Sequence, residues 1–462
     1  MRELACEVAV IGAGTAGIAA FRAAREAGVD AVLIERGPGG TTCARVGCMP
    51  SKLLIAAGAA AHEARQADLF GVRAGPVGVD GAAVMRCVRA ERDRFVGAVL
   101  ESLDGFPDDR RLAGEARFLG PDALDLGGGT RLRFRAAVVA TGSSPSVPEP
   151  LRGLGERVLT TDTVFEIPDL PASLAVLGAG AVGIEVAQAM ARLGVRVSVI
   201  DPGPAPAGLT HPDLVAAAAA IFAQELDLHL GAEMTAAEAD DDGVRLAWRC
   251  ADGSRLERRF DRVLAATGRA PNLDLGLDRA GLSLDGDGRP ALDARTLLCE
   301  GGPVLMAGDV DGLRPVLHEA SRQGGIAGAN AVALVRGTPL RAPEPWTPLA
   351  MVFTHPQAAA VGAPYDPEEE RLVGGVDFRD QGRARIEGRN RGGARLWADR
   401  GGGLLGGELI GPDAEHLAHI LAYAVAAGSN CRDLVDRPVY HPTVEEGLGT
   451  ALSAIAEQVT EH

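Results

Sequence analysis

Two cysteines separated by four residues are the part of this sequence best suited to chemistry. They are Cys43 and Cys48, in the stretch GGTTCARVGCMPSK at residues 39–52. Such a pair could close a structural disulfide, supply half of a zinc site, or form and break a disulfide as a redox couple. No second Cys/His pair with ligand spacing lies nearby, so we predict no metal site. The other five cysteines are isolated, and we interpret them as small buried hydrophobic residues.

A gapless internal repeat indicates the architecture that must position this pair. Residues 12–35 and 178–201 align without a gap, and each copy follows a short β-type run, at 8–11 and 174–177. Each copy then continues as a helix-period segment that leads into a second β-branched run. Strand, glycine turn, helix and strand therefore occur twice, which predicts two Rossmann-like dinucleotide-binding folds.

The three glycines of each turn have separate physical roles. Gly12 allows the tight turn, Gly14 lets the backbone approach a pyrophosphate, and Gly17 lets the helix pack closely on the strand. The equivalent residues of the second copy are Gly178, Gly180 and Gly183. The acid that ends the second strand, Glu35 or Asp201, is placed to accept hydrogen bonds from a ribose 2′-hydroxyl.

Two dinucleotide sites in one chain imply two different dinucleotides, one resident and one exchanging. FAD together with a nicotinamide nucleotide is the natural pair. In the second copy Asp201 would repel a 2′-phosphate, and the residues that follow it, PGPAPAG at 202–208, contain no arginine to attract one. The sequence therefore favours NAD over NADP.

Charge and hydropathy restrict the partners and the compartment. The 462 residues carry a formal charge of −16, which disfavours nucleic acid and anionic membranes as partners. No apolar run is long enough to span a bilayer, and from the first residues we expect no secretory signal. We expect a cytoplasmic protein, where a permanent structural disulfide is improbable.

Five motifs together resemble the flavin-dependent pyridine nucleotide-disulfide oxidoreductases (class I), and most closely the dihydrolipoamide dehydrogenases. The motifs are the cysteine stretch, the paired glycine turns, ATGRAPN (266–272), MAGDV (306–310) and YHPTVEEGL (440–448). The resemblance implies an α/β fold with two Rossmann-like domains, for FAD and NAD, and a C-terminal α+β dimerisation domain. The implied boundaries are 1–148 for the first part of the FAD domain, 149–270 for the NAD domain, 271–342 for the part that completes the FAD domain, and 343–462 for the dimerisation domain.

The same resemblance assigns catalytic roles. Cys43 resembles the thiol that exchanges with the substrate disulfide, and Cys48 resembles the thiol that exchanges electrons with the flavin. His441 matches the general acid/base, and Glu446 matches the carboxylate that orients it. In the family this histidine reaches the cysteine pair of the other subunit, so an obligate homodimer is implied.

Further residues are assigned to the cofactors by resemblance. Lys52 and Glu185 match an ion pair near the reactive edge of the flavin, and Glu185 also belongs to the fingerprint helix of the NAD site. Gly268 falls in the strand-end loop beside the nicotinamide nucleotide. The residues expected near FAD are Ala116, Thr141, Asp309 and His318.

The function implied is NAD-linked oxidation of protein-bound dihydrolipoyl groups, or of free dihydrolipoamide. Departures such as Ala44 and Arg45, where the family usually has Leu and Asn, leave the disulfide substrate open. The alternative is an NAD(P)H-dependent reductase of another low-molecular-weight or protein disulfide. A catalytically inactive flavin-binding scaffold is disfavoured, because all four catalytic matches are present.

Overall fold

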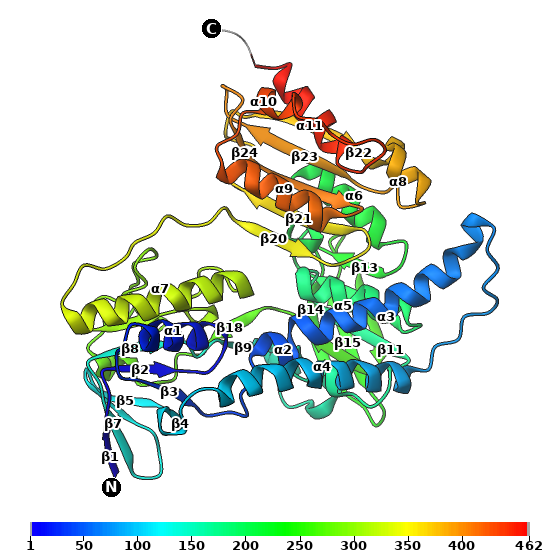
Figure 1. The fold of residues 1–462 in the computed structure, drawn as a ribbon. Helices are drawn as coiled ribbons and strands as arrows, with labels where there is room; N and C mark the ends of the chain where they lie inside the picture. Colours follow the sequence, from blue (N-terminus) through cyan, green and yellow to red (C-terminus); the bar gives the residue numbers. More distant parts are fainter. Residues whose placement is uncertain (1, 460–462) are drawn as a thin grey trace. The chain divides into compact units, whose positions relative to one another are not determined.

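Short β-branched runs alternate with alanine- and glycine-rich helical stretches, and this alternation produces parallel sheets covered by helices. The structure is a computed structural model that describes residues 2–459. The chain forms two compact units, each assembled from three segments of the chain (Figure 1). The first contains the residues up to Pro50, Ala90–Ser146 and Gly268–Pro345, and the second contains Ser51–Arg89, Val147–Thr267 and the residues from Trp346 onward.

A parallel sheet forms the centre of the first unit. Its strand order is β19 (Val304–Met306), β8 (Ala136–Val139), β2 (Val8–Ile11), β3 (Ala31–Glu35) and β4 (Arg111–Ala113). The strands β2 and β8 are apolar at every residue and buried throughout, as expected of a sheet with both faces covered. Because β19 follows the second repeat in sequence, the chain returns to complete the first sheet.

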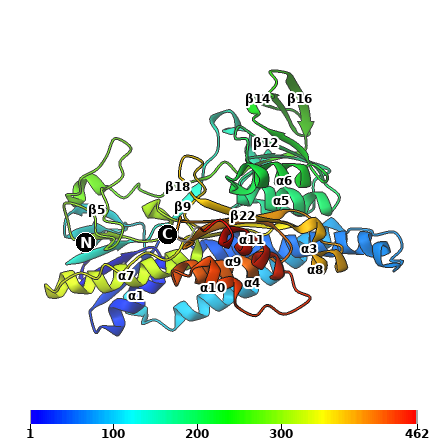
Figure 2. The ribbon, with the colours of Figure 1, turned by 90° about the horizontal axis from the view of Figure 1, so that it is seen from above.

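Two helices of the first unit lie side by side in both views, α1 (Thr15–Glu26) and α7 (Leu317–Arg336) (Figures 1 and 2). Their contact is unusually close. A Cβ at Gly324 would lie 2.2 Å from the carbonyl oxygen of Ala16, and one at Gly328 would lie 2.4 Å from that of Ala20. Backbone therefore packs on backbone, and only glycine fits at these two positions of α7.

Smaller elements complete the first unit. A second sheet has the order β1 (Arg2–Ala5), β7 (Thr130–Arg133), β6 (Ala123–Asp125) and β5 (Arg117–Gly120). The strands β9 (Ser143–Pro145) and β18 (Arg269–Pro271) pair antiparallel. The cysteine stretch forms α2 (Thr42–Val46) and the start of α3 (Cys48–Gln66). Both α3 and α4 (Gly81–Asp104) begin in one unit and end in the other.

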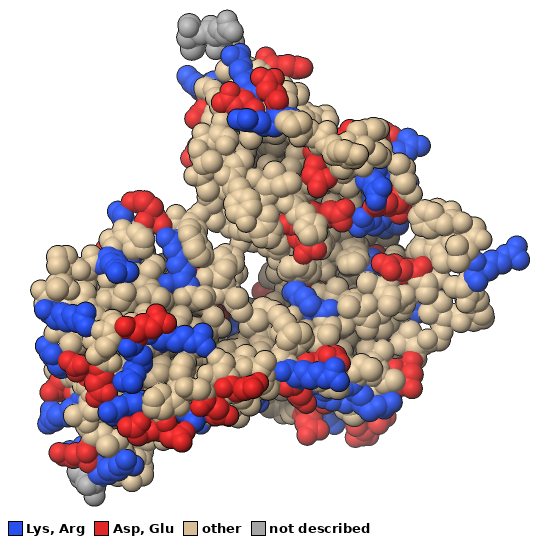
Figure 3. Space-filling view, in the orientation of Figure 1, with Lys and Arg blue, Asp and Glu red and all other residues tan. Residues whose placement is uncertain are grey.

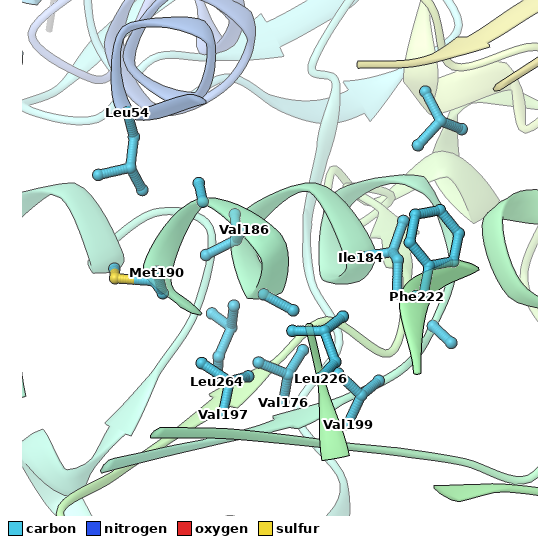
Figure 4. Packing of buried hydrophobic residues seen from close by; sticks show 14 of the residues in the cluster. Leu54, Val176, Ile184, Val186, Met190, Val197, Val199, Phe222, Leu226 and Leu264 are labelled. Atoms are coloured by element: carbon cyan, nitrogen blue, oxygen red, sulfur yellow. The ribbon is translucent and has the colours of Figure 1, made fainter. Parts of the chain in front are cut away.

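The second unit contains the second glycine turn in a parallel sheet of its own. The strand order is β10 (Val158–Leu159), β17 (Arg262–Ala265), β11 (Ser173–Leu177), β12 (Arg196–Asp201) and β13 (Asp227–Leu230). Leu54 of α3 points towards Val186 and Met190 of α5 (Ala181–Arg192), in one apolar cluster (Figure 4). The remaining elements are α6 (Pro212–Phe222) and an antiparallel sheet of β14 (Glu233–Ala239), β15 (Val244–Arg249) and β16 (Arg255–Phe260).

The C-terminal part of the second unit is an antiparallel sheet with helices packed on it. The strand order is β20 (Leu349–Val352), β21 (Gln357–Gly362), β24 (Leu404–Gly411), β23 (Gly393–Ala398) and β22 (Leu372–Asp377). The helices are α8 (Gly382–Ile386), α9 (Ala414–Ala426), α10 (Cys431–Val435) and α11 (Glu446–Ala456). The predicted fold class is therefore confirmed. The four predicted domain ranges remain a prediction. The two units alternate along the chain after Ser146, Thr267 and Pro345, close to the three predicted limits, and also after Pro50 and Arg89.

Charged side chains of both signs are spread over the surface that Figure 3 shows. On the face drawn in Figure 3, basic and acidic side chains are interspersed over both units. Among residues 2–459, no helix has both the length and the apolar character needed to span a bilayer.

Candidate active site

The two glycine turns have nearly the same backbone geometry. Gly12 has φ +104° and Gly178 has φ +106°, values that favour glycine. A Cβ at either residue would lie 2.4 Å from a carbonyl oxygen, that of Ala140 in the first copy and that of Ala266 in the second. Both turns are therefore held against the end of a neighbouring strand.

Of the other two glycines in each turn, one is required by close packing and the other faces open space. A Cβ at Gly17 or Gly183 would lie 1.8 or 1.9 Å from the carbonyl oxygen of the first glycine. A Cβ at Gly14 or Gly180 would meet no described atom within 4 Å beyond its chain neighbours. Each turn is closed on its protein side and open at a helix N-terminus, and this arrangement fits a pyrophosphate.

The acids that end the second strands stabilise these turns directly. Glu35 accepts hydrogen bonds from the amides of Ala13 and Gly37, each at 2.7 Å. Asp201 accepts hydrogen bonds from the two equivalent amides, at 2.5 and 2.6 Å. Each carboxylate thus ties its strand to the glycine turn and to the following loop. Their predicted contact with a ribose remains a prediction.

The cysteine loop folds back tightly on itself. The hydroxyl of Thr41 accepts a hydrogen bond from the amide of Ala44 at 3.2 Å and caps α2. A Cβ at Gly47, between the cysteines, would lie 3.2 Å from the Cα atom of Cys43. Cys48 begins α3, and both cysteines are partly accessible.

Lys52 lies one helical turn after Cys48 and forms the expected ion pair. Its Nζ donates to Oε2 of Glu185 at 2.8 Å, and Glu185 is only 4% exposed. The other carboxylate oxygen accepts the amide of Phe353 at 2.7 Å, and the Phe353 ring centroid lies 4.4 Å from the lysine nitrogen. Glu185 therefore uses both carboxylate oxygens within the protein, and its predicted place in the NAD site remains a prediction.

The His441 and Glu446 side chains also form the expected pair. Nδ1 of His441 lies 2.8 Å from Oε1 of Glu446, whose second oxygen accepts the amide of Thr443 at 3.0 Å. These hydrogen bonds lower the pKa of Glu446, the one from His441 most. The histidine side chain is 80% exposed, so its Nε2 edge is accessible for proton exchange.

Asp309 and Thr141 are held by residues that the sequence did not single out. Asp309 accepts a hydrogen bond from the hydroxyl of Ser143 at 2.8 Å. Arg269 donates to the backbone carbonyl of Ser143 at 2.6 Å. Thr141 donates to the carbonyl of Asn272 at 2.8 Å, and the Asn272 amide donates back at 2.9 Å. The tripeptide Ala-Thr-Gly occurs at 140–142 and again at 266–268, and each copy leads into one of these strands, β9 or β18, so this repeat was the available signal.

The roles of the remaining predicted residues stay predictions. Ala116 is buried, His318 is the second residue of α7, and Gly268 has φ +98° between β17 and β18. The two cysteines and Asp309 belong to the first unit. Lys52 belongs to the second unit, together with His441.

Comparison with known proteins decides the family. Residues 6–324 match the pyridine nucleotide-disulphide oxidoreductases, and residues 349–452 match the dimerisation domain of that family. The chain belongs to this family. Pyridine nucleotide-disulphide oxidoreductases use FAD and NAD(P), with NAD the nucleotide of the dihydrolipoyl dehydrogenases, and the two glycine turns fit these cofactors. The C-terminal match supports a homodimer.

Relatives within the family extend along nearly the whole chain. A dihydrolipoyl dehydrogenase of Halobacterium salinarum is 33% identical over 459 residues, covering 95% of this chain and 94% of the relative. A mercuric reductase of Acidithiobacillus ferrooxidans is 32% identical, covering 98% and 83%. The crystal structure of LpdA from Mycobacterium tuberculosis has a TM-score of 0.82 at 23% identity, covering 98% and 99%, and shows that the fold is shared.

Proposed function

We propose that this oxidoreductase oxidises dihydrolipoyl groups with NAD⁺ through a Cys43–Cys48 redox disulfide. The main supporting observation is the tightly folded cysteine loop at the start of α3, one turn before Lys52. Similarity to dihydrolipoyl dehydrogenases over nearly the full length adds to it. Mercuric reductases are similar to nearly the same extent, so the substrate has to be identified by experiment.

The cysteines perform thiol–disulfide exchange in two steps. A substrate thiolate attacks the Cys43 sulfur, forms a mixed disulfide, and releases Cys48 as a thiolate. The second substrate thiol then attacks the substrate sulfur that is bonded to Cys43, closes the substrate disulfide, and releases Cys43 as a thiolate. The substrate leaves as a disulfide, both cysteines are reduced, and two protons remain to be removed. FAD, when bound, supplies the acceptor through which the electron pair reaches NAD⁺.

His441 removes the protons in this scheme. Glu446 holds Nδ1, which fixes the ring and leaves Nε2 as the basic atom. The side chain is exposed beside Tyr440, which is 84% exposed, so this region offers its histidine to another surface. We propose that His441 of the partner subunit serves each cysteine pair, so that the monomer lacks a complete site.

Lys52 has an electrostatic role. Its ammonium lies on the same face of α3 as Cys48 and is fixed by Glu185 and by the Phe353 ring. A positive charge at this place stabilises negative charge that develops close to Cys48. The nearly buried Glu185 keeps this lysine in one position.

The test is steady-state turnover of dihydrolipoamide with each nicotinamide nucleotide. We expect NAD⁺ to be preferred over NADP⁺ by about 100-fold in kcat/KM, because Asp201 repels a 2′-phosphate. Replacement of Cys48 by Ser should abolish turnover while FAD content stays the same. If dihydrolipoamide gives no turnover but another disulfide is reduced by NADH or NADPH, the substrate proposal is wrong and the alternative reductase is favoured.

A further inference from the structure

One face of α4 packs against the segment that leads into the cysteine pair. Val96, Leu100 and Leu103 recur at helical spacing and therefore share this face. A Cβ at Gly40 would lie 2.9 Å from Cγ1 of Val96, and one at Gly39 would lie 3.2 Å from Cδ2 of Leu100. Gly39 and Gly40 have φ +70° and +90°, values that favour glycine. This part of α4 belongs to the same unit as the two cysteines, so the contact is internal to that unit.

Arg92 is the polar member of the same face, and it is bonded to the cysteine loop. It lies one turn before Val96 and is 8% exposed. Its Nη1 donates to the backbone carbonyl of Arg45 at 3.3 Å, and its Nε donates to Asp93 at 2.6 Å. Arg45 lies between the two cysteines, two residues after the first and three before the second. The guanidinium thus binds the middle of the loop that a disulfide would close.

The carbonyl of Arg45 requires a donor from outside its helix. The helix α2 has only five residues, and the last carbonyls of a helix have no partner within it. Arg92 therefore takes the place of a missing helical N–H. The side chain of Arg45 also ties the loop to its own start, because its Nη1 donates to the carbonyl of Gly39 at 3.3 Å.

The backbone on which this loop turns is strained. Thr41 has φ +57° and ψ +149°, a region that residues with a side chain rarely occupy. The amides of Ala44 and Arg45 donate to the hydroxyl and the carbonyl of Thr41, at 3.2 and 3.1 Å. Because a strained conformation persists only where its surroundings hold it, the loop depends on its contacts with α4.

We propose that Arg92 is a positioning residue that keeps Cys43 and Cys48 at bonding distance in the reduced enzyme. It acts through the Arg45 carbonyl rather than on the sulfur atoms. Reduction breaks one S–S bond, adds two electrons and two protons, and leaves two thiols. These can close again only if their Cα atoms stay about 4–7 Å apart, and a tethered loop raises the effective concentration of one thiol at the other. This inference rests on the redox disulfide of the proposed function.

The proposal fixes the sign of the effect on the reduction potential. Without the tether the reduced loop relaxes more than the closed loop does, so the disulfide becomes easier to reduce and its potential rises. A guanidinium that acted only through its charge would stabilise thiolates, and its removal would lower the potential instead. The direction of the shift therefore separates positioning from electrostatics.

Anaerobic equilibration of the FAD-loaded enzyme with reduced and oxidised dithiothreitol tests the proposal. Dithiothreitol closes to its cyclic disulfide as it reduces the cysteine pair, and alkylation followed by mass spectrometry counts the thiols. We expect Arg92→Leu to shift the equilibrium about tenfold towards the dithiol, a rise of about 30 mV. Arg92→Lys, which keeps the charge and one donor group, should shift it less. Arg94→Gln, an exposed change on the same helix, should leave it unaltered.

Asp93→Ala keeps the test valid if Arg92→Leu does not fold. The Asp93 side chain is 67% exposed, and its removal leaves Arg92 present but held by one hydrogen bond fewer. We expect a smaller rise in the potential. Hydrogen exchange of the Ala44 and Arg45 amides adds a readout that is independent of redox chemistry, and it should be faster in both variants than in the unaltered enzyme.

Two results would overturn the positioning role. One is a potential that is unchanged or lower in the Arg92→Leu and Asp93→Ala variants, and the other is an equal shift in Arg94→Gln. If the unaltered enzyme forms no disulfide between the two cysteines, the proposed function fails. The hydrogen-exchange comparison then still decides whether Arg92 holds the loop.

Discussion

The two glycine repeats have the same turn but differ in what their helices pack against. In α1 one face carries Ala16 and Ala20, and α7 packs against their backbone through glycines. In α5 the helix carries buried polar residues, Glu185, Gln188 and Arg192, which bind groups from other segments. The glycine turn has nearly the same backbone geometry in both copies.

We interpret this difference as a difference in function: the first copy holds a bound cofactor, and the second connects the nucleotide site to catalytic residues. The first copy is sealed by a helix and suits a cofactor that stays. The second copy connects its helix to Lys52 and to the segment containing Phe353, so in the proposed function this helix contacts the reactive region. The glycine motif alone does not distinguish these uses, whereas the residues that follow it do.

The packing of α7 on α1 depends on the glycines of α7. We expect their replacement to have the largest effect on stability. Replacement of Gly324 by Ala places a Cβ 2.2 Å from the Ala16 carbonyl, so α1 and α7 must separate. We expect about 3 kcal/mol of destabilisation and loss of FAD. Thermal melting and the FAD-to-protein ratio measure both. Gly325→Ala, with open space at its Cβ, should be stable or slightly stabilised, and equal effects of the two changes would contradict the packing argument.

The polar face of α5 is tested by Glu185→Ala. The change leaves a charged Lys52 and the Phe353 amide without their acceptor, so we expect a loss of about 2–3 kcal/mol and a lower kcat. Ala19 occupies the equivalent place in α1, and Ala19→Gln should change stability by less than about 0.5 kcal/mol. Denaturant unfolding compares the two variants. A Glu185 variant as stable and active as the unaltered enzyme would remove the distinction between the helices.

The shared turn is tested by the middle glycines. Gly14 and Gly180 have φ −77° and −67°, which any residue adopts, and open space at the Cβ position. Alanine at either place should leave the fold intact but obstruct the nucleotide. We expect Gly14→Ala to reduce FAD content, and Gly180→Ala to raise the KM for NADH about tenfold with FAD retained. The assignment of the two sites is wrong if these effects are exchanged.

A buried carboxyl near the first copy gives the smallest effect. Burial, aided by the charge of Asp309, raises the pKa of Asp311 to about 6, and its Oδ2 makes no hydrogen bond to the described chain. A carboxyl with a raised pKa destabilises the fold when ionised, above pH 6, and the penalty disappears as pH falls towards 4. Asp311→Asn should therefore add about 1 kcal/mol at pH 8 and little at pH 4.5. Melting curves at both pH values decide this, and a gain confined to low pH would contradict it.

Local spacing predicted the glycine turns, and the family resemblance predicted two side-chain pairs, one of which joins residues 133 positions apart. The glycine turns follow from three residues near a strand end, and the Lys52–Glu185 and His441–Glu446 pairs form as the resemblance implied. Phe353 was missed because it binds Glu185 through a backbone amide, which any residue possesses. Ser143 and Asn272 were missed because their partners are distant in sequence.

Anaerobic reductive titration of the purified enzyme with dithionite tests the central claim most directly. If Cys43 and Cys48 form a redox disulfide coupled to FAD, the enzyme takes up about four electrons per FAD, two for each centre. The Cys48→Ser variant should take up about two. An unaltered enzyme that is fully reduced by two electrons per FAD would contradict the account.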